Sequence, residues 1–191
     1  MIKDKKELKY YKEQDRKANK YAPGSKQKLI HFFFPDPIML FLSRLRECEY
    51  LGKQKGIGSK LLYTYYKIKL KKIAIRLGFS IPENVFGPGL SLPHYGTIVV
   101  NPKAKVGANC RLHVCTNIGA SGGTAFAPQI GDNVYIGPGA KLYGNIVIGS
   151  NNAIAANAAV NKSFPDEGNI IGGIPSKVIG ELDIKKIIKH I

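Results

Sequence analysis

A repeat of six residues runs through the second half of the chain. Aliphatic side chains recur in phase from residue 100 to residue 160, with Thr124 as the one exception: Val100, Val106, Leu112, Ile118, Ile130, Ile136, Leu142, Ile148, Ile154 and Val160. Neither the 3.6-residue period of an amphipathic helix nor the two-residue period of a strand explains a strict six. Three such units, each a short strand and a corner, close a triangular coil of about 18 residues. The repeat therefore predicts a solenoid with the aliphatic side chains inside, and disfavours a small β-sandwich. Residues 100–160 suffice for a little over three coils.

Small residues follow many of these inward positions: Gly107, Gly119, Gly131, Gly137, Gly149 and Ala155. A residue with little or no side chain lets the backbone turn at a corner without a steric clash. Between Ile118 and Ile130 the phase continues, but the composition changes to GASGGTAFAPQ, which predicts a loop that leaves the prism wall. After Val160 the repeat stops, and NKSFPDEGN predicts a turn before a short extended segment.

The positive charge of the chain is concentrated before the repeat. The net charge is +16, and residues 1–80 hold 20 Lys/Arg against 7 Asp/Glu, whereas residues 81–191 hold 9 against 6. Two helices are expected in the basic part, one with Asp36 as N-cap and an end at Gly52, the other with Ser59 as N-cap and an end at Gly78. Polar composition predicts partial disorder for residues 1–27. The expected organisation is a helical region (1–80), a β-helix domain (81–180) and a terminal helix (181–191).

Composition also narrows the cellular context. The first 20 residues are charged throughout and lack the apolar segment of a secretory signal. The apolar run HFFFPDPIMLFL is too short and too interrupted for the roughly 20 residues of a membrane span. Three cysteines without CxxC spacing fit free thiols, more plausibly packed in a core than catalytic. These features predict a cytoplasmic protein.

Three segments carry a family resemblance. VGANCRLHVCTNIGASGG, IGDNVYIGPGAKLYGNIVIG and GGIPSKVIG resemble the hexapeptide-repeat acyltransferases, and among them the serine acetyltransferase-like group. The likeness covers about residues 80–180. It implies a left-handed parallel β-helix preceded by α-helices, a homotrimer, and acetyl-CoA in a groove between neighbouring prisms. No metal is expected.

The resemblance implies a catalytic histidine in the segment LPHYG. Acetyl transfer to a hydroxyl requires a base, for which a neutral imidazole is suited, so His94 is the expected general base. An inward, merely packed His94 remains the alternative, because it lies six residues before Val100. The orienting carboxylate of the family would align with Phe79, which leaves Glu83 as the nearest acid. His113 is expected at a groove, as a wall or substrate contact.

The resemblance also assigns residues to the cofactor. Lys177, in the closing motif GGIPSKVIG, would reach the ribose phosphate of CoA as a point charge. The turn that begins at Gly119 offers backbone N–H groups to an oxyanion. The family places coil backbone and small side chains along the pantetheine arm, at positions that match Gly137, Pro138, Ala155 and Ala156.

The acceptor is predicted from departures from the family. Serine acetyltransferases recognise serine with an aspartate before the histidine and an Arg-His pair, where this chain has Pro93, Phe126 and Ala127. A buried amino acid needs partners for its two charges. A sugar hydroxyl does not, and Tyr95 and Phe126 could stack on a pyranose ring. The prediction is therefore O-acetylation of a saccharide in capsule or exopolysaccharide synthesis. Serine O-acetylation in cysteine synthesis is the alternative, and a zinc-dependent lyase or a non-catalytic solenoid module is a weaker one.

Two interpretations fit the basic segment 1–80. Its Lys and Arg side chains favour contact with an anionic membrane surface, which would place the protein at the inner face of a membrane. An ordinary helical cap over the open end of the prism, with solvated lysines, explains the same pattern. Nucleic-acid binding is not expected, since no recognised module accompanies the charge.

Overall fold

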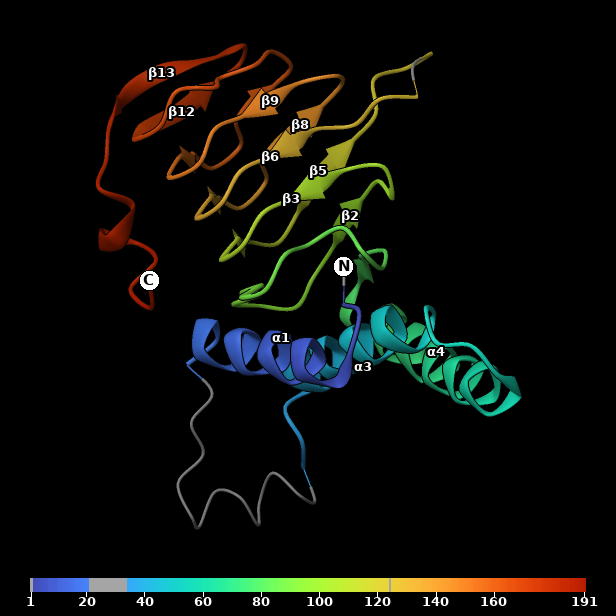
Figure 1. The fold of residues 1–191 in the computed structure, drawn as a ribbon. Helices are drawn as coiled ribbons and strands as arrows, with labels where there is room; N and C mark the ends of the chain where they lie inside the picture. Colours follow the sequence, from blue (N-terminus) through green and yellow to red (C-terminus); the bar gives the residue numbers. More distant parts are fainter. Residues whose placement is uncertain (1, 21–33, 124) are drawn as a thin grey trace.

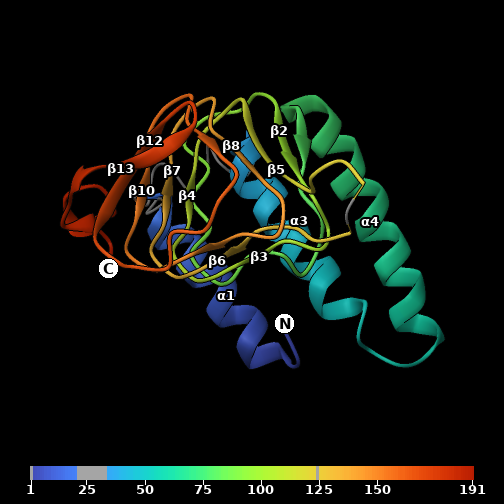
Figure 2. The same cartoon turned by 90° about the horizontal axis from the view of Figure 1, so that it is seen from above.

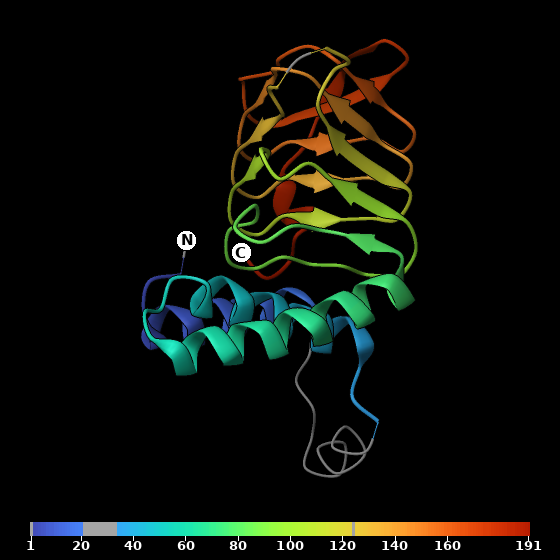
Figure 3. The same cartoon turned by 90° about the vertical axis from the view of Figure 1, so that its right-hand side faces the viewer.

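The protein consists of a layer of helices and a triangular prism of strands that stands on it (Figures 1 and 3). The computed structural model describes residues 2–20, 34–123 and 125–191. Within these residues the layer contains three helices: α1 (Lys5–Ala18), α3 (Pro37–Leu51) and α4 (Ile57–Leu77). Figure 2 looks along the prism axis and shows the coils superposed above α1 and α3, with α4 at one side.

Three parallel walls make up the prism. Wall A contains β1 (Phe79–Ser80), β2 (Ile98–Val100), β5 (Thr116–Gly119), β8 (Lys141–Tyr143) and β11 (Ala159–Val160). Wall B contains β3 (Lys105–Val106), β6 (Gln129–Ile130) and β9 (Val147–Ile148). Wall C contains β4 (Arg111–Leu112), β7 (Tyr135–Ile136), β10 (Ala153–Ile154), β12 (Asn169–Gly173) and β13 (Ser176–Glu181). Only β13 pairs in the antiparallel sense, against β12, among the described strands.

The coils begin earlier than the repeat indicates. Phe79 pairs with Ile98, and isolated bridges join Phe86 to Val106 and Ser91 to Arg111, so a complete coil precedes Val100. Within the described residues wall A therefore holds five strands, one from each coil. Residues 100–160 form the coils predicted for them, and the prism extends beyond this range at its start.

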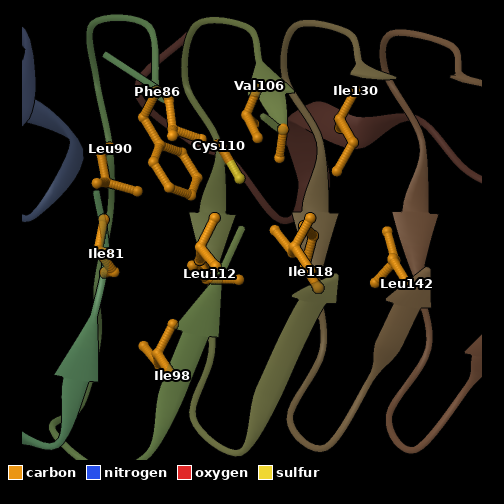
Figure 4. Close-up of a cluster of buried hydrophobic side chains, with 14 of the residues drawn as sticks. Ile81, Phe86, Leu90, Ile98, Val106, Cys110, Leu112, Ile118, Ile130 and Leu142 are labelled. Atoms are coloured by element: carbon orange, nitrogen blue, oxygen red, sulfur yellow. The ribbon is translucent and has the colours of Figure 1, made fainter. Parts of the chain in front are cut away.

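Aliphatic side chains fill the prism as predicted. All ten in-phase residues are at most 5% exposed. Figure 4 shows Leu112, Ile118 and Leu142 stacked from coil to coil inside the walls. Burial of each such side chain contributes about 1.5–3 kcal/mol, so the stack is the main source of stability for this region.

Glycines after the inward positions serve coil stacking rather than turning. A Cβ on Gly131 would lie 2.7 Å from the backbone nitrogen of Ser150, and a Cβ on Gly149 would lie 2.1 Å from the carbonyl oxygen of Pro165. Neither glycine has a positive φ. The expectation that these residues ease the turn is therefore wrong; they let the next coil approach.

Asparagines form the corner between walls B and C. Asn109, Asn133 and Asn151 have φ angles of 56°, 56° and 58°, a left-handed conformation that asparagine tolerates better than most residues. Their side chains form a ladder, in which Asn109 donates to Asn133, Asn133 to Asn151, and Asn151 to Glu167, at 2.7–2.9 Å. The ladder satisfies the side-chain amides while holding successive coils in register.

The loop between β5 and β6 leaves the wall, as its composition predicts. Ile98 pairs with Thr116 and Lys141 pairs with Ala159, in both cases eighteen residues later. Asn117, however, pairs with Lys141, twenty-four residues later. The six surplus residues project from the corner between walls A and B. Thr124, the exception in the repeat, lies outside the described residues.

The terminal segments differ from prediction. α3 has Asp36 as N-cap and ends at Gly52, as expected, but α4 begins after Gly56, so Ser59 lies inside the helix. Residues 5–18, expected to be partly disordered, form α1 with Asp4 as N-cap, and residues 21–33 lie outside the described part of the chain. The expected last helix is reduced to a 3₁₀ turn, Ile184–Lys186.

A buried ion-pair network joins the helices to the first coil. Arg46 on α3 is fully buried and donates hydrogen bonds to Asp15 of α1, to Glu49, and to the carbonyl oxygens of Phe86 and Gly87. The Asp15 carboxylate also accepts two backbone N–H groups of that coil. Burial alone would lower the pKa of Arg46, but the two carboxylates outweigh it and hold the pKa above its usual value.

Candidate active site

His94 projects from the corner between walls C and A in the first coil. Ile98 follows Ser91 by seven positions. In the next coil the partners of these residues are closer in sequence, since Thr116 follows Arg111 by five positions. The two surplus residues bulge outward, and both His94 and its neighbour Tyr95 are exposed. The alternative of an inward, packed His94 is therefore wrong.

His113 occupies the same corner one coil further along. Its ring centroid lies 6.0 Å from that of His94 and 5.1 Å from that of Tyr135. The Nε2 atom of His113 is buried and has no hydrogen-bond partner among the described residues. Burial lowers the pKa of His113, and the charges of Arg111 and His94 act in the same direction. The corner therefore favours a neutral imidazole at this position.

This environment predicts a loss of stability in mild acid. A histidine whose pKa is lowered by folding binds fewer protons in the native state, so the free energy of unfolding falls as pH drops below about 6.5. His190, whose pKa is lowered by burial and by Arg111, adds to the effect. Urea unfolding between pH 7.5 and pH 5 should show a shallower decline for His113→Gln than for the wild type. The double variant with His190→Gln should be shallower still. An unchanged slope in both variants would contradict this account.

A column of small residues continues the corner along the prism. Gly137 and Pro138 follow β7, and Ala155 and Ala156 follow β10. Successive coils are tied here by backbone hydrogen bonds from Gly137 to Ile154 and from Ala155 to Ile171. A Cβ on Gly172 would lie 3.0 Å from the Cβ of Ala155, so the column is closely stacked.

Lys177 marks the far end of this column. It lies in β13, is exposed, and pairs with Gly172 of the last coil. Four coil spacings of about 4.8 Å place this end roughly 19 Å from the first coil. We call the line from His94 through His113 and the small residues to Lys177 the histidine edge. The structure thus brings together seven predicted residues: His94, His113, Gly137, Pro138, Ala155, Ala156 and Lys177.

Three other predicted residues lie at a different corner. Glu83 precedes wall B of the first coil, and its carboxylate accepts hydrogen bonds from Lys67 and Tyr63 of α4. No hydrogen bond joins it to His94 within the described residues, so the structure does not support Glu83 as the orienting acid. Gly119 ends β5, and Phe126 lies in the loop that follows between walls A and B, where it is well exposed. Within one chain, neither reaches the histidine edge.

A cleft of about 350 Å³ opens beside His94, between the prism and the helical layer. Its polar lining comes from α1 and its end, from the start of α3 and from wall C: Asn19, Lys20, Asp36, Ser91, His94 and Arg111. Asp36 contributes a negative charge, and Lys20 and Arg111 contribute positive ones. The Arg111 side chain makes no hydrogen bond or ion pair with another described residue. Sequence reasoning missed this set, because its members come from three separate segments.

The cysteines are free thiols, as expected. Burial raises the pKa of Cys48 and of Cys110 to about 12, whereas Cys115 is exposed, so the packing interpretation is wrong for that residue. Among residues 2–20, 34–123 and 125–191, no three His, Cys, Asp or Glu side chains are grouped as metal ligands. No described helix is both long and apolar enough to cross a bilayer.

Comparisons with known proteins agree with this geometry. The family of bacterial transferase hexapeptide (six repeats) matches residues 127–162. A serine acetyltransferase of Mycobacterium tuberculosis is 36% identical over 102 residues, or 52% of this chain and 44% of that protein. A serine acetyltransferase of Brucella abortus in complex with coenzyme A aligns with a TM-score of 0.67 and 27% identity, covering 93% of this chain and 70% of that one. The chain is similar to the hexapeptide-repeat acyltransferases of the serine acetyltransferase-like group.

Similarity to solved structures of this group confirms the predicted fold. Soybean serine acetyltransferase complexed with serine, at 23% identity and a TM-score of 0.72, shares the architecture over 90% of this chain and 69% of its own. The fold is a left-handed parallel β-helix preceded by α-helices. This serine acetyltransferase-like chain spans less than half the length of the curated relative from Mycobacterium tuberculosis.

The same comparisons overturn the predicted saccharide acceptor. The matching proteins are serine acetyltransferases, so the prediction of a sugar O-acetyltransferase is wrong. The error has a physical source. Pro93, Phe126 and Ala127 carry no charge, but Asp36 and Arg111 line the cleft beside His94 and can pair with the two charges of an amino acid.

Proposed function

We propose that this protein is a serine O-acetyltransferase that uses acetyl-CoA as donor and His94 as general base. The observation that carries the proposal is the position of His94. It is exposed at the end of the histidine edge and lines a cleft in which both signs of charge are present. An acceptor in the cleft and a long donor along the edge would meet at the imidazole.

His94 supplies the proton transfer. Its neutral imidazole accepts the proton of the serine hydroxyl as the hydroxyl oxygen attacks the thioester carbonyl carbon. When the carbon–sulfur bond breaks, the imidazolium returns the proton to the departing thiolate. The products are O-acetylserine and CoA. Exposure of His94 supports this role, because the ring is accessible from both the cleft and the edge.

The cleft offers partners for the two charges of a free amino acid. Asp36 lies at the start of α3, where its Oδ1 atom accepts the N–H groups of Ile38 and Met39. Its carboxylate suits an ammonium group, while the guanidinium of Arg111 and the ammonium of Lys20 suit a carboxylate. A cleft of this size is within the range of small-molecule sites. These charges support L-serine as the acceptor.

The histidine edge supports acetyl-CoA as the donor. Pro138 and Ala156 are exposed and Ala155 is partly exposed, so a narrow ligand can lie along this part of the edge, and Lys177 provides a positive charge at the far end. The structure of the Brucella abortus relative contains coenzyme A, which is consistent with this assignment.

A homotrimer would complete the site. Phe126 and Gly119 lie at the corner between walls A and B, whereas His94 lies at the corner between walls C and A. In a trimer of parallel prisms, the loop of one chain can face the histidine edge of its neighbour. The separation of the two sets within one chain supports this arrangement.

Release of CoA from acetyl-CoA in the presence of L-serine tests the proposal. Arg111→Gln and Asp36→Asn would each remove one charged hydrogen bond to L-serine. Each variant should therefore raise the KM for L-serine by roughly 10- to 100-fold. Ethanolamine lacks the carboxylate of L-serine, so we expect it to be turned over more weakly. Asp36→Asn should lower this turnover further, whereas Arg111→Gln should leave it unchanged. Lys185→Gln, exposed in the 3₁₀ turn away from the cleft and the histidine edge, serves as the control. Absence of turnover with L-serine, or unchanged KM in both cleft variants, would overturn the proposal.

A further inference from the structure

α4 carries an apolar stripe that packs against nothing in the described chain. Ile57, Leu61, Tyr65, Ile68 and Ile75 are each between one-half and four-fifths exposed. Their spacing of four, four, three and seven residues places them on one face of the helix. We call these five residues the α4 stripe.

The stripe is separate from the face by which α4 is anchored. Leu70 and Leu77 are buried, and Tyr63, Tyr66 and Ile73 pack partly against the core. Their positions are on the side of the helix opposite the stripe. Folding of the monomer therefore accounts for one apolar face of α4 and leaves the other without a function.

Every charged residue of α4 is a cation. Lys60, Lys67, Lys69, Lys71, Lys72 and Arg76 belong to the helix, which contains no Asp or Glu. At 100° per residue, Lys60, Lys67 and Lys71 border one side of the stripe, Lys69 and Arg76 border the other, and Lys72 lies within it. Of these six, Lys67 pairs with Glu83, and the other five have no carboxylate partner in the described residues.

We propose that α4 binds the surface of an anionic lipid bilayer, with its axis in the plane of the interface. An apolar stripe bordered on both sides by cations is the pattern of a helix that inserts apolar side chains among the lipids while its cations meet the head groups. Each cation near an anionic surface strengthens binding about fivefold. Because α4 is not apolar enough to span a bilayer, it would lie on the surface.

The charge pattern disfavours two other occupants. A second copy of α4 packed on the stripe would bring cations of both helices together, with no carboxylate on either helix to pair with them. A nucleic acid would satisfy the cations but leave the stripe in water. An anionic lipid surface provides negative head groups for the cations and an apolar interior for the stripe. In the proposed trimer of parallel prisms, three α4 helices would lie at the same end and bind together.

Co-sedimentation of the full chain with lipid vesicles tests this inference. We expect binding to phosphatidylcholine vesicles that contain phosphatidylglycerol, weaker binding at high salt, and little binding to phosphatidylcholine alone. Removing two cations, in Lys69→Gln with Lys71→Gln, should weaken binding about 25-fold. Removing apolar contacts at constant charge, in Leu61→Gln with Ile68→Gln, should weaken it at least tenfold at both salt concentrations. The matched control is Lys185→Gln with Lys186→Gln, which makes the same charge change outside α4.

The outcomes separate the possible occupants. Equal binding to neutral and anionic vesicles, or wild-type binding by both α4 variants, would overturn the inference. If the wild type does not bind lipid but forms an assembly that the Leu61→Gln with Ile68→Gln variant loses, the stripe binds a second copy instead. Binding of a DNA duplex without vesicle binding would assign the cations to nucleic acid. None of these variants touches the histidine edge or the cleft, so CoA release with L-serine tests the proposed function independently and confirms that each variant is folded.

Discussion

Replacement of His94 by alanine is expected to lower kcat for acetyl transfer to L-serine by about 10²–10⁴-fold, the usual contribution of a general base. The side chain is exposed and makes no hydrogen bond with a described residue, so the free energy of unfolding should stay within about 0.5 kcal/mol of the wild type. CoA release and urea unfolding of the same preparations measure the two effects separately.

A second variant decides whether His94 is the base. His113→Gln leaves His94 in place and should retain more activity than His94→Ala. Full activity in His94→Ala would place the base elsewhere. A large loss of stability together with activity would instead give His94 a structural role.

Replacement of Asp15 by alanine is expected to lower the free energy of unfolding by about 3–5 kcal/mol. The change would leave the fully buried guanidinium of Arg46 without one of its two carboxylates, and two backbone N–H groups of the first coil without their acceptor. Thermal or urea unfolding measures the effect directly.

The control for Asp15 lies on the same helix. Glu13 pairs with Lys17 at the surface of α1, so Glu13→Ala should change stability by less than about 1 kcal/mol. Removing all three charges, in Asp15→Leu with Arg46→Leu and Glu49→Gln, should recover part of the loss, since no unpaired charge remains buried. A loss below about 1 kcal/mol in Asp15→Ala would show that water or the remaining carboxylate of Glu49 compensates.

The interior of the prism was predictable because ten positions repeat the same constraint. The first coil was not, since its pairing residues Phe79, Phe86 and Ser91 do not keep the six-residue spacing. α1 was missed for another reason. Its polar composition indicates disorder, and the contacts that stabilise it join Asp15 to residues more than seventy positions away.

The candidate site divides in the same way. The repeat register gives His113, Gly137 and Ala155 equivalent positions, each directly after an inward aliphatic residue of wall C. The cleft beside His94 depends instead on how the helices dock, so no local pattern could assign Asp36 or Arg111 to it. Glu83 shows that closeness in sequence does not place two residues together. It lies only eleven residues before His94, but it belongs to another corner and pairs with Lys67.

The loop between β5 and β6 has a consequence for the evolution of the chain. Within a wall, an insertion of six residues would keep every aliphatic side chain inside but move each later strand to the neighbouring wall, and only multiples of eighteen would preserve all the pairings. The surplus residues after Gly119 escape this rule, because they leave the wall before Gln129 rejoins it. Insertions and deletions among descendants of this sequence should therefore accumulate where surplus residues already leave the coil, as they do in this loop. Such changes could remodel the corner between walls A and B while the rest of the coil register is inherited unaltered.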